Sequence, residues 1–60
     1  MPTYRQLLAA ASLCQVISNF YQPIQLFRYD PRLQSIYIQA GELDDIALII
    51  DEAGEWEFVP

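Results

Sequence analysis

Histidine and lysine do not occur in this chain of 60 residues, and cysteine occurs once, at Cys14. Without histidine, the chain lacks the commonest transition-metal ligand and the usual general base at neutral pH. A single cysteine excludes an internal disulfide, and two separate glycines, Gly41 and Gly54, cannot form a glycine-rich phosphate loop. We therefore expect no cofactor, no metal site and no catalytic residues, and we predict that the protein is not an enzyme.

Basic residues are also scarce, because three arginines stand against eight acidic residues and give a net charge of −5. A chain of this sign repels phosphate backbones and anionic lipid surfaces, so we expect neither nucleic acid nor membranes as partners. The apolar run from Leu7 to Leu13 is at the short end for a secretion signal and has no small residue before Cys14. The sequence thus favours a reduced, cytoplasmic protein.

The first 27 residues carry one charged side chain, Arg5, and all acidic residues lie from Asp30 onward. Thr3 and Gln6 have the spacing of a capping box at the start of a helix. Pro23 disfavours helical backbone at the residue before it. A helix is therefore predicted over about residues 3–21.

Apolar residues cover most of this predicted helix. At about 100° per residue, the polar residues gather in one narrow stripe formed by Arg5, Ser12, Gln15 and Asn19. The expected core face lies nearly opposite and comprises Leu13, Val16, Ile17 and Phe20. One apolar stripe is enough to cover a sheet, so the excess predicts a second buried contact; a small core that wraps the helix is the alternative. The possible protein interface comprises Tyr4, Leu7, Leu8, Ala11, Cys14 and Ile49.

After Pro23 the apolar period changes to two, which is typical of strands. The predicted strands cover about residues 25–29, 35–39, 45–51 and 55–59. Asp30–Leu33 has the composition of a turn, and Gly41 offers a second chain reversal. In the first hairpin the register stays open, since Phe27 can face Ile36 or Tyr37.

Residues 42–50 also fit a helical stripe, but the short, isoleucine-rich run at 46–50 favours a strand. The predicted fold is therefore α+β, with one N-terminal helix packed on a four-stranded antiparallel β-meander in two layers. Residues 1–60 form a single small domain.

In the last predicted hairpin, between residues 45–51 and 55–59, the side chains favour one strand register over the other. A three-residue loop at 52–54 pairs Ile50 with Trp56, whereas a two-residue loop pairs Ile50 with an acidic residue. Because a slip by one residue turns every side chain to the other face, we predict the three-residue loop. It places two like charges, Asp51 and Glu55, opposite each other.

Two candidate sites have simpler interpretations. A nucleophilic Cys14 would need a base or an electropositive setting, but it lies mid-helix among apolar residues and is expected to be a buried structural thiol. The acidic residues at 42, 44, 45, 51 and 52 do not have the alternating spacing of a calcium loop. We expect them to be solvated.

Two segments carry a family resemblance in combination: Tyr-x-Pro-Ile at residues 21–24 and Gly-x-Trp-x-Phe at residues 54–58. Together with residues 26–30 and 36–42, they resemble a family of short, uncharacterised cyanobacterial proteins that is classed as a domain of unknown function. The resemblance covers most of the chain after residue 15. It implies no activity, cofactor or catalytic residue, and it supports the strand at 45–50 and a cytosolic bacterial setting.

Sixty residues bury a marginal core, and a chain without disulfide or metal has oligomerisation as its remaining stabiliser. The leading hypothesis is therefore a self-associating or partner-binding module, a homodimer or a complex with a small protein, that uses its apolar helix face. The alternative is an acidic, antitoxin-like or nucleic-acid-mimicking protein that binds a basic protein partner.

Overall fold

A computed structural model describes residues 1–59, and Pro60, the last residue of the predicted domain, lies outside the described residues. Helix α1 (Tyr4–Asn19) begins with the predicted capping box. The hydroxyl of Thr3 accepts from the Gln6 main-chain N–H at 3.1 Å, and the Gln6 Oε1 accepts from the Thr3 N–H at 2.8 Å. These reciprocal bonds satisfy two donors that a helix start otherwise leaves free.

The helix ends one turn before Pro23. Tyr21 adopts a left-handed conformation with φ of 59°. Its N–H donates to the Ser18 carbonyl at 2.9 Å, and the Gln22 N–H donates to the Ile17 carbonyl at 3.1 Å. This pair of bonds is the Schellman closure, with tyrosine at the position where glycine is usual.

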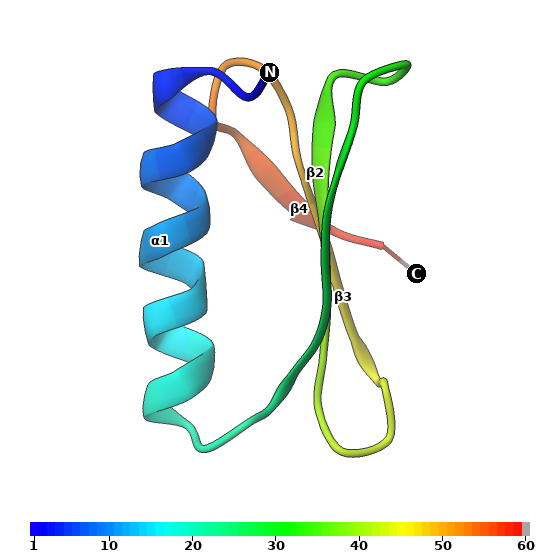
Figure 1. Ribbon diagram of the computed structural model, residues 1–60. Coiled ribbons are helices and arrows are strands. Elements are labelled where there is room, and N and C mark those ends of the chain that lie inside the picture. The colour runs from blue at the N-terminus through cyan, green and yellow to red at the C-terminus, as the bar shows by residue number, and fades with distance from the viewer. Residues whose placement is uncertain (60) are drawn as a thin grey trace.

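Four antiparallel strands follow in the order β1-β2-β3-β4. Their bounds are β1 (Ile24–Asp30), β2 (Ser35–Ala40), β3 (Ile46–Ile50) and β4 (Trp56–Phe58). The helix lies against one face of the sheet, and the two layers are seen edge-on in Figure 1. The predicted α+β meander is thus confirmed, including the strand rather than the helix at residues 46–50.

The last hairpin has the predicted register. Ile50 pairs with Trp56, and Gly54 at the end of the loop has φ of 85°. Asp51 and Glu55 lie opposite each other, as expected. The Asp51 carboxylate is stabilised there because it accepts a hydrogen bond from the Glu55 main-chain N–H at 3.0 Å. One acidic residue therefore caps the turn that carries the other.

Both registers considered for the first hairpin are wrong, since Phe27 pairs with Ile38. The strands extend to Asp30 and Ser35, so four residues rather than three or two form the loop. Gln34, with φ of 51°, makes the reversal in a left-handed conformation. Glutamine is not a residue type that predicts a left-handed conformation. The sequence therefore could not define the register of this hairpin.

The core lies between the sheet and one side of α1. It comprises Ala10, Ile17, Ile36, Ile38, Ala40, Leu48 and Ile50. The predicted core face of the helix is only partly correct, because Val16 is 52% exposed and Phe20 is 71% exposed. The apolar arc is wider than the contact, so helical periodicity alone does not select which part of it faces the sheet.

Gln6 fixes the rotation of the helix. Its side chain is fully buried, and its Nε2 donates to the carbonyls of Gln34 at 2.7 Å and Ile50 at 3.3 Å. The hydroxyl of Thr3 donates to the Glu52 carbonyl at 2.8 Å, which places the N-terminus beside the β3–β4 loop in Figure 1. The start of the helix is thereby joined to the β1–β2 loop and to the β3–β4 loop.

Candidate interaction surface

Four apolar residues of α1 form an exposed surface that we name the helix patch; they are Tyr4, Leu7, Leu8 and Ala11. Tyr4, Leu7 and Leu8 are 75%, 47% and 52% exposed. Their spacing of three and four residues makes them neighbours on the helix surface. No acidic residue occurs in α1, so the patch has no carboxylate of its own helix beside it.

The other two residues of the predicted interface lie elsewhere. Cys14 is partly buried against the core, and this burial raises the pKa of its thiol above the ordinary value of 9.0. Ile49 pairs with Tyr37 and Glu57, and these positions alternate with the buried ones, so it lies on the sheet face away from α1. The structure therefore brings four of the six residues together.

The helix patch lies mainly on the side of α1 away from the sheet, and Leu7 is its member on the β1 flank. On the opposite flank, the Arg5 backbone lies so close to Gly54 that a Cβ added there would be 2.9 Å from the Arg5 oxygen. Gly54 belongs to the loop that leads into β4. Leu7 is two residues further along the helix, a rotation of about 200°, with the buried face of Gln6 and Ala10 between the flanks. Leu7 therefore borders the edge that β1 forms.

One helix cannot cover four strands. Strands lie about 4.8 Å apart, whereas a helix with its side chains is about 10–12 Å wide. Phe27 on β1 and Trp56 and Phe58 on β4 belong to the helix-facing side, yet they are 49%, 47% and 65% exposed. The sequence analysis did not identify these aromatic residues as exposed. The width of one helix, compared with that of four strands, could have predicted that the outer strands are left uncovered.

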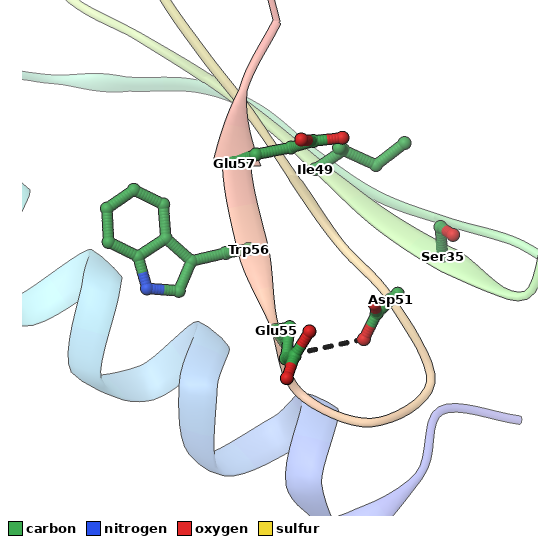
Figure 2. Close-up of a pocket in the computed structure, with 6 residues that line it drawn as sticks. All are labelled: Ser35, Ile49, Asp51, Glu55, Trp56 and Glu57. Carbon is green, nitrogen blue, oxygen red and sulfur yellow. Dashed lines mark hydrogen bonds between the residues drawn. The ribbon is translucent and has the colours of Figure 1, made fainter.

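The outer face of the sheet has two shallow hollows, each with a volume of about 290 Å³. The first is shown in Figure 2 and is lined by Ser35, Ile49, Asp51, Glu55, Trp56 and Glu57. Asp51 is engaged there, since its Oδ1 accepts from the N–H groups of Ala53 and Glu55 at 2.9 and 3.0 Å. The indole of Trp56 points away from the hollow, toward α1 in Figure 2, and packs edge-on against Phe58 with ring centroids 5.5 Å apart.

The second hollow lies nearer β1. It is lined by Leu26, Arg28, Asp30, Leu33, Ser35, Tyr37 and Ile49. Arg32 in the adjoining loop lies 3.7 Å from the Asp30 carboxylate. The β1 side of the molecule therefore carries basic groups beside its acid, whereas the other hollow is lined by carboxylates.

Two further properties bear on chemistry. Across residues 1–59, no three histidine, cysteine or acidic side chains are grouped so that they could hold a metal ion. Among the same residues, α1 is too short and too little apolar to cross a membrane. The feature that stands out on the described surface is thus the distribution of its apolar side chains.

The chain was compared with known proteins and families. Comparison with curated proteins and with solved structures gives no match. A family model described as Domain of unknown function (DUF6888) matches residues 1–57, which spans α1 and the sheet as far as Glu57 in β4. Because the match takes in nearly the whole chain, this protein belongs to the DUF6888 family.

Proposed function

We propose that this protein is a non-enzymatic cytoplasmic module that acts by associating with a second copy of itself through the helix patch. The observation that carries the proposal is the group of exposed apolar side chains on α1, a helix that contains no acidic residue. Large exposed apolar groups of this kind mark interaction sites more often than they occur on free monomers. The single cysteine cannot form an internal disulfide, and residues 1–59 contain no group of side chains that could hold a metal ion. A subunit contact is then the remaining way to enlarge the core.

The leucines of the helix patch supply part of the free energy of association. Full burial of a leucine contributes about 1.5–3 kcal/mol, and Leu7 and Leu8 each have about half of their surface left to bury. Two copies contribute such residues twice. Together these leucines contribute about 3–6 kcal/mol. Lost translational and rotational freedom costs at least as much, so other exposed side chains such as Tyr4, which is 75% exposed, must add to the contact.

The test is light-scattering sizing of the wild type from 1 to 100 μM, roughly the range over which such dimers dissociate, with two matched variants. Leu8→Lys alters the patch, and Val16→Lys alters a different flank of α1 where the side chain is equally exposed, at 52%. We expect a dimer for the wild type and for Val16→Lys, and a monomer for Leu8→Lys. A wild type that is monomeric throughout this range contradicts the proposal.

The carboxylate-lined hollow favours a second candidate function, capture of a basic protein partner. Glu55 and Glu57 lie at this hollow on a chain of net charge −5, and charge of one sign steers a partner of the other. Binding of a lysine- or arginine-rich partner would then weaken steeply with salt. Glu55→Gln/Glu57→Gln should abolish that salt dependence, and a partner retained equally at 50 mM and 500 mM salt would contradict this candidate.

A further inference from the structure

The two edges of the sheet differ in length and in protection. β4 has three residues and β1 has seven. An exposed edge presents unpaired N–H and C=O groups, and proteins blunt such edges with short strands, charges or bulges. β4 is short and carries Glu57 at its centre. β1 has one irregularity, between Ile24 and Leu26, and a regular register from Leu26 to Asp30.

Apolar side chains border the β1 edge on both faces of the sheet. On the helix side lies Phe27, which is half exposed and pairs with the buried Ile38. On the outer side, Leu26 and Leu33 line the second hollow. A strand added at this edge would gain main-chain hydrogen bonds and would cover apolar surface above and below them.

Charge limits where a second copy can approach. The chain carries −5 overall, so a second copy is repelled by most of the surface. β1 contains one base and one acid, Arg28 and Asp30, and α1 carries Arg5 without an acid. The β1 edge and the helix above it are therefore where two copies of this acidic chain repel each other least.

We propose that two copies pair antiparallel through their β1 strands, with Phe27 facing Phe27 of the second copy at the two-fold axis. The pairing joins two four-stranded sheets into one of eight strands and places both helices on the same face. The inference rests on the proposed self-association and specifies its geometry.

A two-fold axis at a residue of β1 keeps both helices on one face, because residues that face each other across an antiparallel pair point to the same side. Three such axes lie near the centre and the loop end of the strand. A two-fold axis at Arg28 would set two arginines opposite each other, which is unfavourable. An axis at Tyr29 pairs Arg28 with Asp30 and Tyr29 with itself, but leaves the other four residues of the strand without a partner within β1. An axis at Phe27 spans the full length of β1, with the irregularity between Ile24 and Leu26 at each end of the pair. It also stacks two half-exposed aromatic rings, so it is the register that the sequence of β1 favours.

The helix patches meet above this junction. α1 lies over β1, β2 and β3, so with strands about 4.8 Å apart the two helix axes would be roughly 14 Å from each other. That separation exceeds the usual 8–10 Å between packed helices. The Phe27 rings below and the side chains of Leu7 and Tyr4 above would fill the space, which gives the exposed patch a contact.

Two experiments test the register. Phe27→Glu and Phe27→Lys should each be monomeric, and an equimolar mixture of the two should restore the dimer, since unlike charges then face each other. In a Cys14→Ser background, Phe27→Cys should form a disulfide-linked dimer on mild oxidation, because facing Cα atoms lie about 4.5–5.5 Å apart. Phe58, an exposed aromatic residue on the same sheet face at the other edge, is the control at which Phe58→Glu should stay dimeric and Phe58→Cys should not cross-link.

The outcomes separate this inference from the proposed function. A dimeric wild type whose Phe27→Glu variant remains dimeric, with its fold confirmed by circular dichroism, overturns the edge pairing and leaves self-association standing. Cross-linking at Phe58→Cys in place of Phe27→Cys overturns it as well. A wild type that is monomeric at 100 μM, a concentration well above a micromolar dissociation constant, overturns both. Restoration of the dimer only in the Glu/Lys mixture supports the pairing at Phe27.

Discussion

The side-chain amide of Gln6 donates a 2.7 Å hydrogen bond to the carbonyl of Gln34, 28 residues further along the chain. The same nitrogen reaches the Ile50 carbonyl at 3.3 Å, and the oxygen of the amide caps the helix through the Thr3 N–H. A fully buried polar side chain is tolerated because each of its hydrogen-bonding atoms has a partner. This residue connects the helix start with the ends of two strands.

Replacement of this glutamine tests its role. Gln6→Leu leaves the Gln34 and Ile50 carbonyls without their donor, and each unsatisfied buried group costs about 1–3 kcal/mol. We expect the free energy of unfolding, measured by urea titration, to fall by about 2–4 kcal/mol. Gln15→Leu is the control on the exposed side of α1 and should change stability by less than about 0.5 kcal/mol. An equal effect of both variants would contradict the bridging role.

Gln6→Glu should make stability depend on pH. An ionised carboxylate at this buried position would face two carbonyl oxygens, so the folded state raises the pKa of the new side chain above its unfolded value. The protonated form can still donate. Stability of the variant should therefore be highest at acid pH and decrease as pH rises through the range above about 4.3. Thermal melts from pH 3 to 7, compared with the wild type, measure this difference.

The two glycines should respond unequally to alanine. Both have positive φ, 93° at Gly41 and 85° at Gly54, so both substitutions introduce backbone strain of about 1 kcal/mol. At Gly54 the new Cβ would also lie 2.9 Å from the Arg5 backbone oxygen, whereas at Gly41 it would meet the exposed, movable side chain of Asp45. Gly54→Ala should lower the melting temperature clearly more than Gly41→Ala. The reverse order would show that the Arg5 contact is not close.

Tyr21→Gly should stabilise the protein. Tyr21 is 92% exposed with φ of 59°, so glycine relieves strain of about 1–2 kcal/mol while its greater freedom in the unfolded chain returns about 0.5–1 kcal/mol. A net gain of about 0.5 kcal/mol in the free energy of unfolding is expected. Phe20→Gly, at the neighbouring cap position with φ of −92°, should instead destabilise the protein, since no strain is relieved there.

The partly buried thiol of Cys14 should make the folded protein less stable at alkaline pH. Burial raises the pKa of its thiol above the ordinary value of 9.0 in the folded state. Above that pH the unfolded chain has released its proton while the folded chain retains it, so the free energy of unfolding falls as pH rises. Urea titrations at pH 7 and pH 10 should show a smaller decrease for Cys14→Ala than for the wild type. An identical decrease in both proteins would contradict the buried thiol.

The local signals in the sequence predicted most of the fold. The capping box, Pro23 and the change of period at residue 24 set the elements, and the pairing of Trp56 with Ile50 selected the last register. The first register failed because Gln34 turns the chain in a left-handed conformation, which glutamine rarely signals. Sequence signals thus predicted the structure correctly where a residue type strongly prefers one backbone conformation, and they failed at Gln34, where the residue type has no such preference.

The candidate site was predicted less completely. Helical periodicity identified an excess of apolar surface on α1, and Tyr4 and Leu8 are indeed exposed. It could not identify which side faces the sheet, because long-range contacts of Gln6 and Gly54 decide that rotation. The possible interface also included Ile49, which belongs to the sheet and lies on its face away from α1. A one-dimensional pattern contains no information on such distant contacts.

The bonds that join the helix start to Glu52 and Ile50 span 49 and 44 residues, which has a consequence for the order of folding. Contacts this far apart in sequence carry a large loop-closure entropy and form after local hairpins. We expect φ-values near zero for substitutions at Thr3 and values of about 0.5 or more in the β2–β3 hairpin. The junction would therefore govern how slowly the protein unfolds rather than how quickly it folds.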